Sequence, residues 1–128
     1  MKDKIKAVQK FHEAFKVNIQ NKPTVAITED RKNLRFELMK EENQEYFEAA
    51  KNNDLVEVAD ALGDMLYILC GTIIEHGMQD KIEAVFNEIQ RSNMSKLDEN
   101  GKPIYREDGK VLKGSNYFKP NIKAILEA

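Results

Sequence analysis

Acidic side chains recur at helical spacing in two neighbouring segments, "EENQE" and "DLVEVADALGDMLYILC". The acids concerned are Glu41, Glu42, Glu45, Glu57, Asp60 and Asp64. Carboxylate oxygens are the ligands that hard divalent cations prefer, and their spacing at three or four residues places them on one side of a helix. This pattern predicts a site for Mg2+, with Mn2+ as a possible substitute.

The second acidic segment is otherwise apolar and small. At about 100° per residue, Glu57, Asp60 and Asp64 fall within a sector of roughly 60° on a helix. No Lys or Arg occurs between residues 55 and 70 to pair with them. Burying an unpaired carboxylate is costly, so we expect these acids to share a bound cation.

The first acidic segment admits an ordinary interpretation as well. Glu41, Glu42 and Glu45 spread over about 100° of a helix, which is also typical of a solvated charged face. A di-iron bundle would need a Glu-x-x-His motif on two helices, and neither His12 nor His76 lies in one. A P-loop motif is absent too.

Helices are predicted to position these acids. Apolar periodicity and capping residues predict helices over about residues 2–16, 28–51, 55–76, 78–93 and 121–128. Asp54 is the expected N-cap of the third helix and Gly77 its left-handed stop, and Met78 is assigned to the apolar stripe of the fourth. The short "NND" connection predicts that the second and third helices pack antiparallel.

A β-hairpin is predicted after the fourth helix. In "GKPIYREDGKVLKG", Asp108 and Gly109 stand between two short β-prone runs. The expected fold is therefore all-α, a four- to five-helix bundle with a small C-terminal β-hairpin. At 128 residues the chain is expected to be a single domain, 1–128.

Composition restricts the classes of partner. The net charge of −2 disfavours a general attraction to nucleic acid or to an anionic membrane. The longest apolar run, residues 65–74, is too short to span a bilayer, and the N-terminus lacks a signal core. The lone Cys70 indicates a buried thiol in a reducing compartment. We expect a cytoplasmic protein that binds neither nucleic acid nor membrane.

Basic residues concentrate near the C-terminus. Residues 96–123 contain seven Lys or Arg against four Asp or Glu, whereas residues 37–64 are acid-rich. An acidic centre and a basic tail could hold a metal-bound polyphosphate from two sides.

The acidic motifs resemble those of a known superfamily. "EENQE" followed by "EVADALGD" is similar to the EExxE and ExxD motifs of the MazG-like, all-α nucleoside triphosphate pyrophosphohydrolases. That superfamily also contains phosphoribosyl-ATP pyrophosphohydrolase and the dimeric dUTPases. "FHEAF", "RSNMSKL" and "GKPIYREDGKVLKG" resemble segments of its phage and bacterial branch, so the similarity covers most of the chain.

The resemblance implies a helical bundle, usually completed by a second subunit as a homodimer or higher homo-oligomer. It implies Mg2+-dependent cleavage between the α- and β-phosphates of a nucleotide substrate, which leaves a nucleoside monophosphate and pyrophosphate. The implied metal ligands are Glu42, Glu45, Glu57, Asp60 and Asp64. Either Glu41 or Glu42 would be the catalytic acid that orients or deprotonates the attacking water.

The register of the ExxD motif has an alternative. In many relatives the aspartate directly precedes an "LLY"-like run, which would make it Asp64 and would put Ala61 where the glutamate belongs. We assign Glu57 and Asp60 because both carboxylates exist in that register, and Asp64 remains an additional ligand.

Substrate contacts are also implied by the resemblance. Phosphate contacts would come from Arg91, Asn93, Lys96, Lys110, Lys113 and Tyr117, and nucleobase contacts from Phe11, His12 and Phe15. The ordinary interpretations are a solvated basic tail and an aromatic core stripe. The alternative functions are a phosphoribosyl-ATP pyrophosphohydrolase type of activity and a non-catalytic helical dimer with a structural ion.

Overall fold

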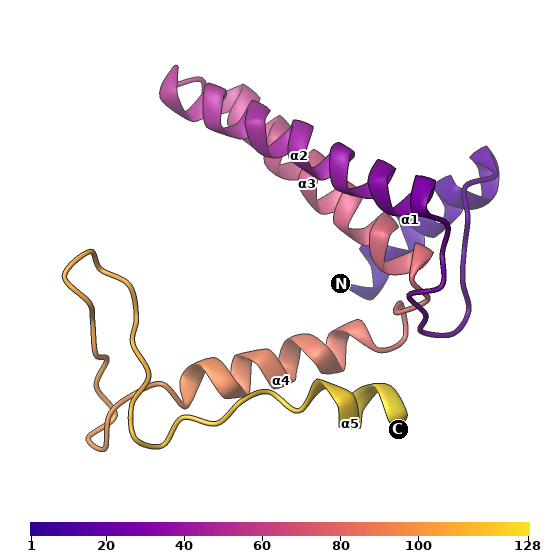
Figure 1. The fold of residues 1–128 in the computed structure, drawn as a ribbon. Helices are drawn as coiled ribbons and strands as arrows, with labels where there is room; N and C mark the ends of the chain where they lie inside the picture. The colour runs from indigo at the N-terminus through magenta and orange to yellow at the C-terminus, as the bar shows by residue number, and fades with distance from the viewer. The chain divides into compact units, whose positions relative to one another are not determined.

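Five α-helices make up the regular structure of the chain. The computed structural model describes residues 1–128 and contains no named strand. The helices are α1 (Lys2–Phe15), α2 (Glu29–Lys51), α3 (Leu55–Glu75), α4 (Ile82–Met94) and α5 (Ile122–Glu127) (Figure 1). The predicted all-α class is confirmed. No helix combines the length and apolarity that crossing a lipid bilayer requires.

The chain divides into two compact units, residues 1–80 and residues 81–128. Unit 1 contains α1, α2 and α3, and unit 2 contains α4 and α5. The single-domain assignment stays a prediction.

Helices α2 and α3 form an antiparallel pair, as predicted (Figure 1). Thr28 caps α2, its hydroxyl accepting a hydrogen bond from the Arg31 backbone N–H at 3.3 Å. Asp54 caps α3 by accepting from the Glu57 N–H at 3.1 Å. These caps satisfy donors at the helix N-termini and fix where each helix begins. Residues on the C-terminal part of α2 therefore face the N-terminal part of α3.

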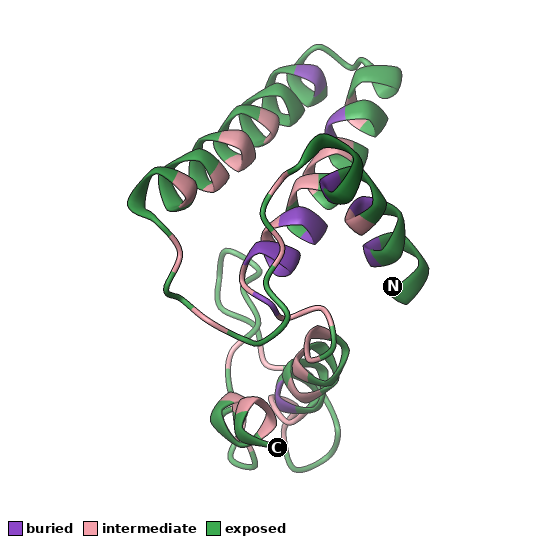
Figure 2. Ribbon diagram, turned by 90° about the vertical axis from the view of Figure 1, so that its right-hand side faces the viewer, coloured by how far each residue is buried: buried purple, intermediate pink, exposed green.

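The core of unit 1 gathers around the second half of α3. Cys70, Ile73 and Ile74 are buried there, and Ile5 and Val8 are buried on α1, which packs against α3 (Figure 2 shows the buried residues in purple). Burial confirms the expectation for Cys70, and it raises the pKa of that thiol. A neutral thiol is a poor nucleophile, so Cys70 acts as a small apolar core residue.

The first half of α3 differs from its expected burial. Leu55 and Val56 are 79% and 75% exposed, Glu57 and Asp60 are exposed, and Asp64 is half-buried. The expectation that all three acids lie in the core is therefore wrong for Glu57 and Asp60. The reason is that α1 packs against α3 around residues 63–71 and leaves the earlier turns uncovered within this unit.

A buried ion network ties α2 to the end of α3. Glu75 is 1% exposed and accepts two hydrogen bonds from Arg31, Nε to Oε1 at 2.7 Å and Nη2 to Oε2 at 2.9 Å. Arg35 Nη1 lies 3.0 Å from Glu75 Oε2. The Arg35 guanidinium fits because Gly71 has no side chain: a Cβ there would lie 2.5 Å from Arg35 Nη2 and 3.0 Å from His12 Nε2.

Helix α3 ends in a Schellman motif. Met78 N–H donates to the Ile73 carbonyl at 2.9 Å, and Gly77 N–H donates to the Ile74 carbonyl at 3.0 Å. Gly77 has φ 68°, and a Cβ there would overlap the carbonyl of Lys22. The predicted left-handed stop is confirmed. Because Met78 closes this motif and α4 begins only at Ile82, the assignment of Met78 to the fourth helix is wrong.

Unit 2 is held together by side chains of α4. The buried Ser92 hydroxyl donates to the Phe118 carbonyl at 2.8 Å, and Phe118 N–H donates to Ser95 Oγ at 3.2 Å. Glu88 Oε2 accepts from the Asn121 N–H at 2.7 Å, just before the predicted terminal helix α5. The long connection is thus anchored to α4 at several points.

The predicted β-hairpin is wrong. Arg106 N–H donates to the Lys110 carbonyl at 2.8 Å and Leu112 N–H to the Ile104 carbonyl at 2.8 Å, but only one isolated antiparallel bridge forms, between Tyr105 and Val111. Both bridge residues are exposed. A lone two-stranded ribbon with no packed face is marginal in water, so the turn forms without strands.

Candidate active site

An open acidic hollow of about 440 Å3 lies between α2 and α3 in unit 1. Glu45 of α2 and Glu57 and Asp60 of α3 line it, so it brings together three of the predicted metal ligands. The remaining lining residues are Glu48, Ala49, Asn52 and Asp54. The antiparallel pairing and the short connection at residues 52–54 produce this arrangement. Glu48 and Asn52 are additional polar groups that the motif comparison did not indicate.

Glu42 of α2 is close enough to acids of both α2 and α3 for their charges to affect it. It is half-buried, and its Oε2 is buried without a hydrogen-bond partner. Burial, a hydrogen bond with Glu45, and the negative charges of Asp64, Glu45 and Asp60 raise the pKa of Glu42 to about 7. The sequence alternatives included a solvated face for Glu42, and its buried oxygen does not fit that description.

Both aspartates of the ambiguous motif lie near Glu42. Asp64 and Asp60 each contribute repulsion at its carboxylate, and Asp60 also lines the acidic hollow together with Glu57. Ala61 is 1% exposed. A glutamate at position 61 would therefore have to be buried, whereas Glu57 reaches the hollow. The assignment of Glu57 and Asp60 stays a prediction, since Asp64 repels the Glu42 carboxylate more strongly than Asp60 does.

Glu41 does not line the acidic hollow. It is exposed and borders a separate hollow of about 350 Å3 on α2, lined by Glu37, Lys40, Glu41, Gln44 and Glu45. Glu42, by contrast, is in electrostatic contact with Asp60 and Asp64 of α3.

The donor set suits a hard divalent cation. No group of three or more His, Cys, Asp or Glu side chains is arranged in the structure so as to hold a metal ion. The acids around Glu42 nevertheless offer only oxygen ligands, and Glu42 Oε2 is a buried oxygen that lacks a partner. Carboxylates that repel one another gain most from a cation between them, so the type of donor, though not the present spacing of the side chains, suits Mg2+ or Mn2+.

The three residues predicted to contact the nucleobase differ in their exposure to solvent. Phe11 and Phe15 are 40% and 67% exposed, and their ring centroids lie 4.4 Å apart. His12 is 2% exposed, and its Nδ1 donates to the Asn18 carbonyl at 3.0 Å. The structure places His12 in the core, next to Gly71. A nucleobase contact from Phe11 or Phe15 remains open to a ligand, whereas one from His12 would require movement.

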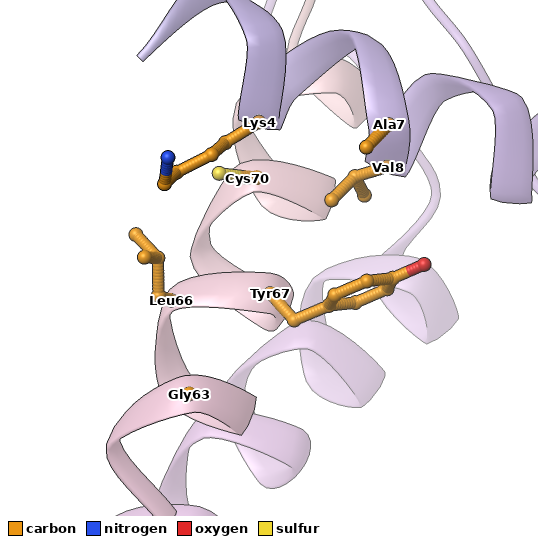
Figure 3. Close-up of a pocket in the computed structure, with 7 residues that line it drawn as sticks. All are labelled: Lys4, Ala7, Val8, Gly63, Leu66, Tyr67 and Cys70. Carbon is orange, nitrogen blue, oxygen red and sulfur yellow. The ribbon is translucent and has the colours of Figure 1, made fainter. Parts of the chain in front are cut away.

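Tyr67 contacts Phe11, one of these two phenylalanines. Its ring meets Phe11 edge-on, with centroids 5.7 Å apart. Tyr67 also borders a small apolar pocket of about 140 Å3 between α1 and α3, with Lys4, Val8 and Cys70 among the other lining residues (Figure 3). The position of Tyr67, three residues after Asp64 on α3, was a sequence signal that we did not use.

Three of the predicted phosphate contacts lie on or just after α4. Arg91 donates to both oxygens of Glu88, at 2.9 Å and 3.3 Å, and stacks over the Phe118 ring. It is thus engaged within unit 2. Asn93 and Lys96 line a hollow of about 400 Å3 in the same unit.

The other predicted phosphate contacts lie in the connection to α5. Lys113 Nζ lies 4.7 Å from the centroid of the Tyr117 ring, and Lys110 is exposed. All six belong to unit 2, whereas the acids belong to unit 1. Their contact with phosphate stays a prediction.

Comparison with known proteins identifies the class. The sequence model of the phosphoribosyl-ATP pyrophosphohydrolase family (PRA-PH) matches residues 8–93, a span that includes every acid of the site. The chain therefore belongs to this MazG-like family, as the motif resemblance predicted. No curated protein matches the chain.

A solved structure supports the same class. It is that of a candidate NTP pyrophosphohydrolase from Exiguobacterium sp. 255-15, which is 27% identical in sequence. The match covers 97% of this chain and 94% of that chain, with a TM-score of 0.54.

Proposed function

We propose that the protein is a Mg2+-dependent nucleoside triphosphate pyrophosphohydrolase that cleaves the bond between the α- and β-phosphates. The products would be a nucleoside monophosphate and pyrophosphate. The observation that carries this proposal is the environment of Glu42, whose buried oxygen has no partner while Glu45, Asp60 and Asp64 repel its charge. Family membership and the solved NTP pyrophosphohydrolase candidate support the same reaction.

The acids have distinct roles in this proposal. Glu45, Glu57, Asp60 and Asp64 would hold Mg2+ or Mn2+ together with Glu42. When bound, the ion would neutralise charge on the triphosphate and polarise the phosphoryl group. Helices hold the carboxylates at fixed spacing, so little reorganisation is needed when substrate arrives.

Proton transfer is assigned to the first acidic motif. Glu42 lies beside the acids assigned to the metal ion, so its carboxylate could accept a proton from a water activated there. Glu42 therefore suits the role of general base better than Glu41 does. Glu41 is retained as the alternative because it remains accessible to water.

Substrate binding would use the remaining groups. Arg91, Asn93, Lys96, Lys110, Lys113 and Tyr117 are assigned to the phosphates. Cationic side chains suit phosphoryl oxygens because they form charge-assisted hydrogen bonds. The exposed pair Phe11 and Phe15 is assigned to the nucleobase, because aromatic faces can stack on a base.

A phosphoribosyl-ATP pyrophosphohydrolase type of activity is the second candidate. The description of the matching family favours it. The chemistry at the phosphates would be the same, since both reactions cleave an α–β phosphoanhydride bond. The two candidates differ only in the group carried on the α-phosphate, so a substrate panel separates them.

We also propose that the protein forms a homodimer or a higher homo-oligomer. Leu55, Leu62 and Leu66 are 79%, 51% and 37% exposed and lie within about 40° of one another on α3. A contiguous apolar stripe of this kind is typical of a protein interface. A second copy of the chain would remove the stripe from water.

Release of pyrophosphate tests the proposed reaction. A panel of ribo- and deoxynucleoside triphosphates and phosphoribosyl-ATP is incubated with the protein, with and without Mg2+. Glu45→Ala and Asp60→Ala should each reduce kcat by about 100-fold or more, because metal binding is impaired. The helical circular dichroism spectrum should stay unchanged.

The matched control is Glu13→Ala, which removes an exposed acid from α1 and should leave kcat unchanged. Full activity in either site variant would contradict the assigned roles. Absence of pyrophosphate release from every substrate of the panel would leave the non-catalytic dimer as the better explanation.

A further inference from the structure

His12 is buried, although Phe11 and Phe15 on the same helix are exposed. The exposed fraction is 2% for His12, against 40% for Phe11 and 67% for Phe15. The proposed stacking of a nucleobase on the two phenylalanines leaves the imidazole ring without an assigned role. A buried polar group costs free energy unless it is hydrogen-bonded, so the partners of this ring indicate what it does.

The ring of His12 is held by the chain that follows α1 and by α3. Its Nδ1 donates to the Asn18 carbonyl at 3.0 Å, in the connection after α1. Its Nε2 would lie 3.0 Å from a Cβ at Gly71, so the ring rests close to the backbone of α3. Because Gly71 has no side chain, the ring fits there while Nδ1 keeps its hydrogen bond.

The main chain of His12 closes the last turn of α1. Its carbonyl accepts from the Val17 N–H at 2.8 Å and from the N–H of Lys16, the C-cap residue. Lys16 has φ 58°, the left-handed conformation that commonly ends a helix. The ring bond fixes Asn18, the residue after Val17. The main chain and the side chain of His12 thus act together to set where α1 ends.

Phe15 is the last residue of α1, so its position depends on this closure. Its ring centroid lies 4.4 Å from that of Phe11, which is one turn earlier on the same side of the helix. The Tyr67 ring of α3 supports Phe11 at 5.7 Å. Phe15 is 67% exposed, so neighbouring side chains constrain it little and the backbone of the last turn has to place it.

We infer that His12 is a positioning residue of the proposed nucleobase site. It acts through the end of α1, where it holds Phe15 beside Phe11, and it does not contact the base. The inference rests on the proposed function, in which these two rings stack on the base. It replaces a direct contact from His12, which the burial of the ring opposes.

Loss of this positioning should weaken substrate binding without slowing the chemical step. Two rings that are already in place lose little conformational freedom when a base stacks on them. The stacking should be equally strong in the ground state and in the transition state, because the reacting bond lies at the phosphates. KM should therefore rise while kcat stays unchanged.

Two amide substitutions test which ring nitrogen matters. The amide of His12→Asn can donate from the position of Nδ1, whereas the amide of His12→Gln reaches the position of Nε2 and leaves the Asn18 carbonyl without its donor. On the nucleoside triphosphate that the panel selects, His12→Gln should raise KM by about fivefold or more and keep kcat within about twofold. His12→Asn should restore most of the natural KM. Nuclear Overhauser contacts between the Phe11 and Phe15 rings should be lost in His12→Gln and kept in His12→Asn.

A double-mutant cycle with Phe15→Ala tests whether His12 acts through Phe15. Phe15→Ala should itself raise KM, and the addition of His12→Gln should raise it little further. Should His12→Gln fail to fold, substitutions of the exposed Lys16 provide a second test. Lys16→Val disfavours the left-handed cap and should raise KM, whereas Lys16→Gly removes the same charge, keeps the cap and should not.

An unchanged KM in His12→Gln, an equal rise in both amide variants, or additive effects in the cycle would each overturn the inference. So would retained contacts between the Phe11 and Phe15 rings in His12→Gln, which NMR detects whether or not the chain hydrolyses a nucleotide. A natural chain that releases no pyrophosphate contradicts the proposed function instead.

Discussion

Glu42 should make the stability of the folded chain depend on pH. Its raised pKa means that, between about pH 4.5 and pH 7, the folded chain retains a proton that the unfolded chain has lost. The free energy of unfolding should therefore fall as pH rises through this window, by about 2 kcal/mol once solvent screening is allowed for. The cause is burial of a charge beside Glu45, Asp60 and Asp64.

Glu42→Gln should remove this pH dependence. The measurement is urea unfolding at pH 5 and at pH 8 in the presence of a chelator, for the variant and for the natural chain. Glu41→Gln is the matched control, since Glu41 is exposed and should keep the original slope. An unchanged slope in Glu42→Gln would show that other groups cause it.

Glu75 was missed by sequence reasoning, which attended to the acids nearer the start of α3. Glu75→Gln should reduce the free energy of unfolding by about 3 kcal/mol, because Arg31 and Arg35 would keep their buried charges with a weaker partner. Chemical denaturation at neutral pH measures the loss. Glu29→Gln, which breaks only the exposed pair with Lys32, should cost less than about 1 kcal/mol. Equal costs for the two variants would contradict a structural role for the buried network.

At the scale of helices, two glycines of α3 have different roles. Gly71→Ala would place a Cβ 2.5 Å from Arg35 Nη2, whose guanidinium is held by three contacts and cannot withdraw cheaply. We expect a loss of about 2 kcal/mol in the free energy of unfolding. A Cβ at Gly63 would meet nothing within 4 Å. Gly63→Ala should therefore be neutral or stabilising by up to about 1 kcal/mol, through helix propensity.

Thermal and urea unfolding of both alanine variants provide the comparison. A stabilised Gly71→Ala chain would show that Arg35 and His12 can rearrange around the added methyl group. The two variants separate the effect of helix propensity from the effect of side-chain packing, because both make the same chemical change in α3 and only Gly71→Ala adds a close contact.

Local signals predicted most helix boundaries correctly. Asp54 is the N-cap that the sequence indicated, and its side chain accepts the expected backbone hydrogen bond. Thr28 and Asn121, which the sequence placed only near helix starts, cap their helices in the same way. The hairpin prediction failed because Asp108 and Gly109 indicate only a turn. They do not indicate whether the flanking residues have a surface to pack on, which stable strands need.

At the scale of the whole molecule, the exposed leucines of α3 predict self-association. Light scattering should give at least twice the mass of one chain. Leu62→Glu should shift the protein toward a monomer, because it puts a charge in the apolar stripe. Val25→Glu, at an exposed residue outside the helices, should not. A monomeric natural chain would contradict the proposed assembly.

The sequence by itself determined the family, the helices and the order of the acidic motifs. Those features depend on periodicity, caps and residue types, which are local properties of the chain. The tertiary structure alone decided which acid is buried, which carboxylate is paired and where the hollows lie. Burial of Glu42 and the ion network of Glu75 with Arg31 and Arg35 both arise from contacts between helices. Such contacts depend on which faces meet, and periodicity along one helix does not specify the face of its neighbour.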